Sequence, residues 1–365
     1  KISRHAFSIA TADGESRTTR ANLKIQDGCD SMCSFCVIPF ARGRARSRDR
    51  ADLLREAQAL IAAGRRELVL TGVNIGTWRD HEPDKPAREA LPAPTRDATT
   101  GVAKEEGADF LGLVEALLEL PGLDRLRISS IEPTTVSQGL IDLMSEDPKL
   151  VPHLHIPLQS GSSRILAQMK RQHDQAYFLD LLERAAARVP DAMFATDVMV
   201  GFPGETDADF EESVTVLETS PLVYAHLFRF STRPGTAAER MLTRDVKAAV
   251  PAPVAKERMH RLMMISQAKH AAYRTRFVGR TVRVLIEQES VGTSDEFLKV
   301  EVHRPDGSRL PRGWLGRVQV ERVEGDRLIG TTVAEPDARG GGRERSEGLR
   351  RETEASATPA PGQVR

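Results

Sequence analysis

Residues 25–36 read Ile25-Gln-Asp-Gly-Cys29-Asp-Ser-Met-Cys33-Ser-Phe-Cys36, and they contain every cysteine of the 365-residue chain. The spacing is CxxxCxxC, and the loop follows directly on a short apolar run, Leu23–Gln26. An odd number of cysteines on one short loop argues against a disulfide framework and indicates a reducing environment. The sequence therefore predicts that Cys29, Cys33 and Cys36 are metal ligands.

An iron–sulfur cluster suits three thiolates on one loop. Three irons of a [4Fe-4S] cluster bind the cysteines, and the fourth is left open to the amino and carboxylate groups of S-adenosylmethionine. An electron from the reduced cluster then breaks the bond between the sulfonium and ribose C5′, which gives a 5′-deoxyadenosyl radical. Structural zinc requires four ligands, but there is no fourth cysteine, and His5 and His81 are distant in sequence. Three inert buried thiols are the other alternative, which the polar loop disfavours.

Short apolar runs alternate with amphipathic stretches after the cysteine loop. The runs are Leu23–Gln26, Glu67–Thr71, Leu126–Ser130, His153–Leu158, Phe194–Val200 and Tyr224–Phe230. Strands that alternate with helices imply βαβ units and a parallel sheet. Six such units predict an α/β fold, a partial (β/α)6 barrel rather than a closed eight-fold one. The cysteine loop then lies at the carboxyl edge of the strands, where barrel active sites are built.

The rest of the chain divides around this barrel. A long helical stretch runs from about Val254 to Phe277, and short β-branched runs after it predict a small all-β, OB-like barrel. The predicted parts are a linker at 1–20, the α/β barrel at 21–245 with a Pro-rich insertion loop at 79–108, a connecting helix at 246–277, the small barrel at 278–335 and a disordered tail at 336–365.

Composition restricts the class of protein. The formal net charge is zero, from 52 basic and 52 acidic residues, so only local patches bear on a nucleic-acid partner. No apolar run reaches the roughly 18 residues of a membrane span, and no charged-then-apolar leader opens the chain. We expect a monomeric cytoplasmic protein with no membrane partner. Because the chain opens on Lys1 rather than Met, we also expect an upstream segment.

Polar residues and glycines follow the predicted strands. Each has a structural alternative: a glycine in a tight turn, Ser160 as a helix N-cap, or Glu132 as a carboxylate at a helix start. Asp197 lies within an apolar strand and so requires a hydrogen-bond partner. Their shared position favours a binding site for the cosubstrate. The predicted contacts are Phe35, Thr71, Gly72, Asn74, Ser130, Glu132, Gln159, Ser160, Asp197, Gly201 and Arg233.

Five arginines alternate with other residues from Arg42 to Arg50. In an extended segment they share one side, which suits a phosphate backbone or the carboxylate of the cosubstrate. A solvated surface is the alternative. The small barrel adds further basic residues, and barrels of this size often bind RNA. The predicted RNA-binding residues are Arg42, Arg44, Arg46, Arg48, Arg283 and Arg312.

Several segments together resemble the methylthiotransferase family of radical S-adenosylmethionine enzymes. They are residues 23–43 around the cysteines, Leu70–Gly76, His155–Gly161, Asp197–Thr206 and Ser231–Thr236, and the likeness covers roughly residues 17–333. The final barrel resembles the TRAM domain, which binds RNA in this family. The segment Arg127–Pro133 looks most like the branch that acts on N6-threonylcarbamoyladenosine next to the anticodon of tRNA. The branches for isopentenyladenosine and for an aspartate of a ribosomal protein are the alternatives.

The resemblance implies a reaction and its partners. One S-adenosylmethionine methylates sulfur, and a second gives the radical that takes hydrogen from C2 of the adenine ring, so that a methylthio group is added. The implied partners are tRNA and a reductant such as flavodoxin or ferredoxin. A hypothesis of another class is a non-catalytic module that binds metal and RNA.

The sequence also departs from the family pattern. The family has an amino-terminal domain with three further cysteines that hold an auxiliary cluster, and this sequence shows none of them. We therefore expect a fragment that binds one cluster and does not complete thiolation by itself. The acidic residue that is usual within the arginine segment is replaced by Ala45, so this position receives no role.

Overall fold

The computed structural model describes residues 18–80 and 108–333. The predicted tail at 336–365 lies outside the described residues, as do most of the predicted linker and most of the insertion loop. The limits predicted for the domains remain predictions. The first strand begins at Arg20, three residues before the predicted apolar run, so Arg20 belongs to the barrel and not to the linker.

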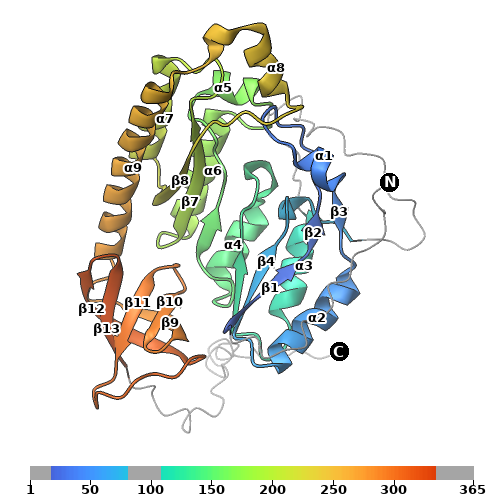
Figure 1. Ribbon diagram of the computed structural model, residues 1–365. Coiled ribbons are helices and arrows are strands. Elements are labelled where there is room, and N and C mark those ends of the chain that lie inside the picture. The colour runs from blue at the N-terminus through green and yellow to red at the C-terminus, as the bar shows by residue number, and fades with distance from the viewer. Residues whose placement is uncertain (1–17, 81–107, 334–365) are drawn as a thin grey trace, which may run out of the picture.

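Six parallel strands form the larger part of the molecule (Figure 1). They occur in two sheets, β1-β4-β5 and β6-β7-β8, each in chain order. Parallel bridges from Leu126 to Leu150 and from Ser130 to His155 join β5 to the β6 side, which makes one curved array. The strands are β1 (Arg20–Lys24), β4 (Glu67–Thr71), β5 (Arg125–Ile128), β6 (His153–His155), β7 (Met193–Val200) and β8 (Tyr224–Arg229).

Helices follow these strands as the periodicity predicts. Asp49, Ser137, Asp174 and Thr206 each accept a backbone N–H at a helix start, which is why the helices begin there. The apolar faces of these helices share one buried core with the strands, except that Ile165 of α5 packs in a smaller separate cluster. The helices are α2 (Arg50–Ala62), α3 (Ala108–Leu118), α4 (Gln138–Glu146), α5 (Ser163–Gln168), α6 (Gln175–Arg188) and α7 (Asp207–Thr219), with 3-10 turns η1 (Ile75–Thr77) and η2 (Pro133–Thr135).

The arginine segment is not the extended row that its alternation predicts. Pro39 stands in the first turn of a short helix, α1 (Ile38–Arg42), and Gly43 ends it with φ +82°. The chain then pairs β3 (Arg46–Ser47) with β2 (Gln26–Asp27) in antiparallel fashion. Because a helix, a turn and a bridge follow each other within this segment, the arginines do not share one side.

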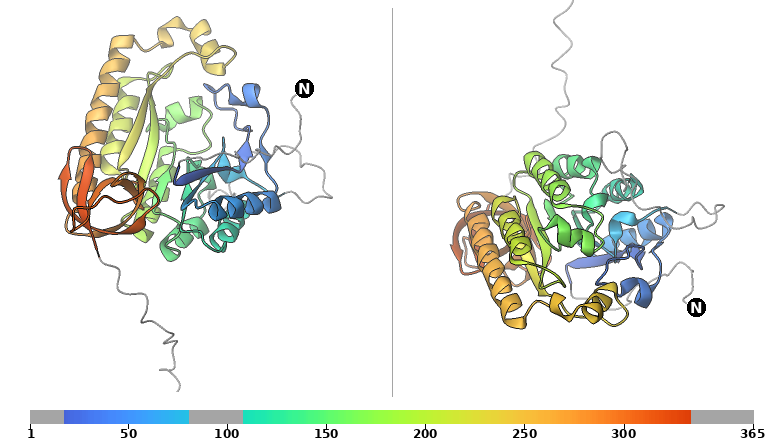
Figure 2. Two further views of the ribbon diagram at one scale, coloured as in Figure 1. Left: turned by 60° about the horizontal axis from the view of Figure 1, so that its bottom comes forward. Right: turned by 90° about the horizontal axis from the view of Figure 1, so that it is seen from above.

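The chain continues through α8 (Ala237–Arg244), η3 (Val246–Ala248) and the long helix α9 (Ala252–Thr275) into a small closed barrel. Its strand order is β10-β11-β13-β12-β9. The barrel lies at the end opposite to α1 and α8, and α9 runs between the two ends (Figures 1 and 2). The strands are β9 (Thr281–Gln288), β10 (Val291–Ser294), β11 (Lys299–His303), β12 (Leu315–Glu324) and β13 (Arg327–Thr332).

The predicted architecture, a partial (β/α)6 barrel followed by a small β-barrel, is confirmed. The sequence predicts four strands in the small barrel, at Arg280–Glu287, Phe297–His303, Trp314–Val323 and Arg327–Val333. It does not reveal the short strand β10, which has four residues and contains Gly292. A Cβ at Gly292 would lie 2.1 Å from the carbonyl oxygen of Leu285, so only glycine allows β9 and β10 to approach this closely.

A buried ion cluster joins the two barrels. The Glu67 side chain is fully buried, and its carboxylate receives Arg125 Nη2 at 2.9 Å and Arg127 Nε at 2.7 Å. Arg125 also donates to the carbonyl oxygens of Thr293 and Ser294 in the small barrel, at 2.9 and 3.0 Å. Burial alone would raise the pKa of Glu67, but the two guanidinium groups outweigh it and hold the pKa below its usual range.

Replacing this carboxylate is expected to destabilise the whole chain. Glu67→Gln leaves the buried Arg127 without a counter-charge and leaves Arg125 with Asp295 alone, at 3.3 Å, which costs about 3–5 kcal/mol. Urea unfolding followed by circular dichroism measures the loss. The matched control is Glu324→Gln, in an exposed pair with Arg322, where a change within about 0.5 kcal/mol is expected. Equal effects of the two substitutions would contradict a structural role for the cluster.

Candidate active site

The cysteine loop is tied to the carboxyl edge of the strands. Gln26 is fully buried, and its amide oxygen accepts the N–H groups of Val73 and Asn74 at 3.0 and 2.8 Å, which links the start of the loop to the end of β4. Gly28 has φ +73°, and a Cβ there would lie 2.1 Å from the carbonyl oxygen of Arg44. The path of the loop therefore requires glycine at this position.

The three thiols are free and half-buried. Each sulfur accepts a hydrogen bond: Cys29 from Ser31 N at 3.3 Å, Cys36 from Ile38 N at 3.4 Å, and Cys33 from Arg171 Nη1 at 3.5 Å. Donors directed at sulfur stabilise thiolates, which are the form that binds metal. Burial raises the pKa of the Cys33 thiol, and Arg171 opposes that rise.

This donor set fits an iron–sulfur cluster better than a single metal ion. Across residues 18–80 and 108–333, no three His, Cys, Asp or Glu side chains converge as ligands of one ion. In a cubane cluster each thiolate binds a different iron, so such convergence is not required. Buried polar atoms without partners also face this end of the molecule, namely Ser34 Oγ, Asn74 Oδ1 and Arg171 Nε. They are hydrogen-bonding groups for a bound cofactor.

Arg171 joins the cysteine loop to the end of β5. Its guanidinium group pairs with the Glu132 carboxylate, with Nη1 to Oε1 at 3.2 Å, while it also donates to Cys33. The Arg171 side chain is only 5% exposed, so the pair is held in place by packing. The sequence predicts Glu132 as a cosubstrate-binding residue. It does not predict Arg171, because Arg171 lies in the turn between α5 and α6 and no motif marks it.

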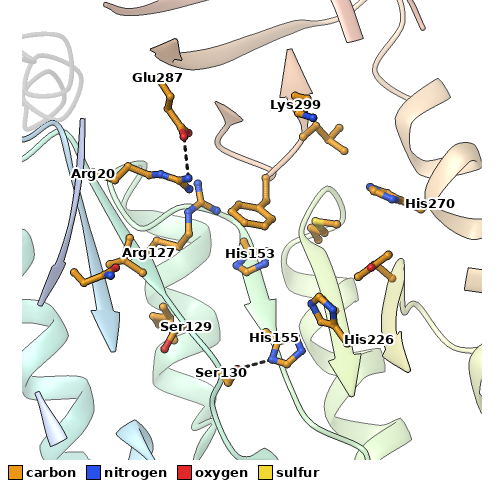
Figure 3. Close-up of a pocket in the computed structure, with 18 of the residues that line it drawn as sticks. Arg20, Arg127, Ser129, Ser130, His153, His155, His226, His270, Glu287 and Lys299 are labelled. Carbon is orange, nitrogen blue, oxygen red and sulfur yellow. Dashed lines mark hydrogen bonds and ion pairs between the residues drawn. The ribbon is translucent and has the colours of Figure 1, made fainter. Parts of the chain in front are cut away.

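Ser130 and Asp197 are brought together by a residue that was not predicted. His155 Nδ1 lies 2.6 Å from Ser130 Oγ, and His155 Nε2 lies 3.2 Å from Asp197 Oδ1. His155 is therefore the charged or polar neighbour of Asp197 in the apolar strand, although its Nε2 makes no hydrogen bond with a described residue. The three side chains come from β6, β7 and the segment after β5, and Figure 3 shows Ser130 and His155 facing each other.

The remaining residues that were predicted to bind the cosubstrate lie along the same edge, but they differ in how deeply they are buried. Thr71 ends β4, and Gly72 allows the close approach of the Gln26 carbonyl. Gln159 has φ +73° and pairs with β7 through its backbone. Ser160 is fully buried and accepts the N–H of Ser162, so its role here is structural.

Three more of these residues stand near the later strands. Gly201, with φ +79°, donates its N–H to Glu205 Oε2 at 2.6 Å. Phe35 packs against a cluster of apolar side chains that includes Phe202 and Met169. Arg233 is exposed.

The predicted RNA-binding arginines mostly bind carboxylates of this chain. Arg48 is 2% exposed and binds both Asp52 and Glu56, so it is a structural residue and not a free surface cation. The others remain at least partly exposed, and their ion pairs are local: Arg42 and Arg46 with Asp27, Arg44 with Asp30, and Arg283 with Asp295. Arg312 is exposed and has no ion pair with a described residue.

A cavity of about 890 Å³ lies at the other end of the same strands. It is lined by residues that begin the strands, such as Arg20, His153 and Tyr224, and by the β10–β11 turn of the small barrel (Figure 3). Ser130 and His155 also line it. These two side chains therefore stand between the cavity and the cysteine end of the barrel.

Comparisons with known proteins show which family the chain resembles. Residues 23–217 match the model of the radical SAM superfamily. The chain is 35% identical over 323 residues to tRNA-2-methylthio-N(6)-dimethylallyladenosine synthase of Cereibacter sphaeroides, covering 87% of this chain and 66% of that protein. The like-named proteins of Clavibacter sepedonicus and Sphingopyxis alaskensis are 35% identical too, with 85% and 80% of this chain and 56% and 61% of theirs covered.

The chain thus spans about 56 to 67% of the length of the curated relatives that it matches. Among solved structures, the radical S-adenosylmethionine methyltransferase TsrM from Kitasatospora setae aligns with a TM-score of 0.45 at 16% identity, covering 60% of this chain and 38% of that one. Methylornithine synthase aligns with a TM-score of 0.42 at 14% identity, covering 68% and 62%. No described helix is long and apolar enough to cross a membrane.

His173, two residues after Arg171 in the chain, gives a testable pH dependence. His173 is buried, its Nε2 lies 3.3 Å from the Leu158 carbonyl oxygen, and burial together with Arg171 lowers its pKa from 6.5 to about 3. The unfolded chain therefore binds more protons than the folded chain below pH 6.5. We expect the free energy of unfolding to fall as the pH drops from 6.5 towards 3, by up to about 1.4 kcal/mol per pH unit.

Urea unfolding between pH 7 and pH 5 measures this slope. His173→Gln keeps an N–H donor for Leu158 but removes the titrating ring, so its slope is expected to be flatter than that of the wild type. His260→Gln, at an exposed position on α9, is the matched control and should leave the slope unchanged. Parallel slopes for all three proteins would rule out a buried neutral His173.

Proposed function

Because the chain belongs to the radical SAM superfamily, we propose that it forms the radical-generating part of a tRNA methylthiotransferase that acts on an N6-modified adenosine. The observation that carries the proposal is the loop of three free cysteines at the carboxyl edge of a partial barrel, with Arg171 bridging Cys33 and Glu132. The names of the 35% identical relatives support the substrate class. The [4Fe-4S] cluster and S-adenosylmethionine are the cofactors of this superfamily.

Within this proposal the chain's own residues have separate tasks. Cys29, Cys33 and Cys36 hold the cluster, which when bound supplies the electron that cleaves S-adenosylmethionine. Arg171 and Glu132 fix the position of the loop relative to β5. Partly buried apolar side chains such as Phe35 pack on the side of the loop near α5 and α8, which restricts water there.

The identity of the nucleoside is part of the proposal. We assign N6-dimethylallyladenosine first, because that nucleoside stands in the names of the relatives. The comparisons do not support the threonylcarbamoyladenosine that the Arg127–Pro133 segment predicted. It stays the second candidate because the Arg127–Pro133 segment resembles that branch of the family. The reductant, the monomeric state and the cytoplasmic location stay predictions.

Cluster binding and cosubstrate cleavage test the enzyme class. After anaerobic reconstitution, about four irons per chain and dithionite-dependent release of 5′-deoxyadenosine are expected. Cys33→Ala should lose both, since it removes one of three ligands. Met32→Ala is the control, because Met32 lies in the same loop and is 56% exposed. A folded wild-type chain with one zinc, no iron and no cleavage would overturn the proposal in favour of a metal-binding module.

Substrate preference is tested with anticodon stem–loop RNAs that differ only in the N6 substituent. The dimethylallyl RNA is expected to bind about ten-fold more tightly than the unmodified RNA, which corresponds to about 1.4 kcal/mol, and to stimulate 5′-deoxyadenosine release. Fluorescence anisotropy and chromatography are the measurements. If the threonylcarbamoyl RNA is the one that binds and stimulates, the second candidate replaces the first. Equal binding of all three RNAs would contradict a role for the substituent.

A further inference from the structure

The cavity between the two barrels is larger than the reacting group alone requires. It encloses about 890 Å³, within the range of cavities that take a whole nucleotide-sized ligand. Its far end is bounded by the β10–β11 turn, with Phe297, Leu298 and Lys299 in the lining. The side chains at that end come from the first residues of the strands, whereas the cysteine loop lies beyond their last residues.

Because of this separation, the residues at the far end of the cavity have no direct role in the radical step. His153 is the first residue of β6, and Gln159, at the cosubstrate edge, lies six residues further along. On the neighbouring strand β7, the partners of His153 and Gln159 are Met193 and Val198. Five residues of extended chain separate these partners, so the two levels are about 16 Å apart. A base that reacts next to the cosubstrate does not reach Phe297 at the same time.

The far end has the chemistry of a base-stacking site. Three imidazoles in the cavity, His153, His226 and His270, have pKa values lowered chiefly by burial, so they are neutral near pH 7. The rings of His153 and Phe297 lie 4.5 Å apart. Neutral aromatic walls stack with nucleobases irrespective of their sequence.

Charged groups surround these rings. The Arg127 guanidinium carbon lies 4.8 Å from the centre of the Phe297 ring. Arg20 pairs with Glu287 at 2.9 Å and Lys299 pairs with Asp326 at 3.2 Å, whereas Arg312 has no ion pair with a described residue. A ring wall beside the Arg312 guanidinium group, which no described carboxylate pairs, is an arrangement that can bind a base together with its phosphate.

Phe297 is held in an unfavourable backbone conformation. Its φ is +64°, which residues other than glycine rarely adopt, and the residue is 40% exposed although its side chain is large and apolar. Such strain persists only where the surrounding structure enforces it. Here Arg125 and Arg127 bind the carbonyl oxygens of Ser294 and Asp295 at the start of the same turn. The ion cluster thus presents the ring to the cavity.

We infer that the far end of the cavity binds a nucleobase of the substrate RNA other than the one that is modified, stacked against Phe297. This inference rests on the proposed RNA substrate and adds a second point of contact to it. The small barrel then contributes to recognition inside the cavity and not only through its outer surface. The alternative occupant of the cavity is the cosubstrate S-adenosylmethionine, and the binding experiment distinguishes it from a nucleobase.

Phe297→Gly is the informative substitution, because it removes the ring and suits the positive φ. Ser290→Gly, at φ +56° in the neighbouring turn of the same barrel, is the matched control outside the cavity lining. Both variants should keep the wild-type thermal midpoint within a few degrees. Both should also release 5′-deoxyadenosine from S-adenosylmethionine without RNA at the wild-type rate.

The binding test is a double-mutant cycle with the reconstituted chain. Anticodon stem–loop RNAs, each with one abasic position, are titrated against the wild type and both variants by fluorescence anisotropy. Phe297→Gly is expected to weaken binding of the intact RNA about 5- to 150-fold, as loss of one stacked base does. At one position other than the modified adenosine, the abasic RNA should show no further loss with Phe297→Gly. Ser290→Gly should show no such coupling.

The outcomes are distinguishable from failure of the proposed function. If the wild type cleaves S-adenosylmethionine but the losses are additive at every position, the stacking inference is wrong and the enzyme class stands. Coupling only at the modified adenosine would also overturn it, as would a wild type that binds no RNA. An altered Kd for S-adenosylmethionine in Phe297→Gly would assign the cavity to the cosubstrate instead. Absence of iron and of cleavage in the wild type refutes the enzyme class alone.

Discussion

The buried carboxylate of Glu67 determines how the two barrels meet. It stands at the first residue of β4, and it offsets the charges of Arg125 and Arg127 on the neighbouring strand. Without it, Arg127 would be buried with no counter-charge and Arg125 with Asp295 alone, at a cost of several kcal/mol. Because these arginines also bind backbone oxygens of the β10–β11 turn, the same interaction closes the amino ends of the strands with the small barrel. The cavity exists because of this closure.

The two ends of the parallel strands therefore have different chemistry. The carboxyl edge has the cysteine loop, the Arg171–Glu132 pair and orphan polar atoms, all suited to a charged cofactor. The amino ends have neutral imidazoles, an exposed phenyl ring and bordering cations. His155 stands between them, fixed by Ser130 on one nitrogen and Asp197 on the other. Its ring cannot turn without breaking the hydrogen bond to Ser130.

Local signals account for what the sequence predicted correctly. The strands and helices of the larger barrel follow from apolar periodicity, and the metal-ligating loop follows from the spacing of three cysteines. Pairing between residues far apart in space or sequence accounts for the roles that the sequence did not predict. Arg48 looks like a surface cation in sequence, but Asp52 and Glu56 on the next helix neutralise it and allow its burial. Arg171 and His155 carry no motif, and their roles appear only when β5, β6 and the α5–α6 turn come together.

Arg48 and Phe297 show why the exposure of a residue says more about its role than its residue type does. A charged residue that the chain itself neutralises is structural, even beside a cofactor loop. Phe297 is 40% exposed and has a backbone conformation that residues other than glycine rarely adopt, and its ring contacts are His153 and the Arg127 guanidinium group. Glycine at this site would relieve the backbone but would lose both ring contacts. A stacked ligand accounts for the part of the residue that these contacts leave exposed.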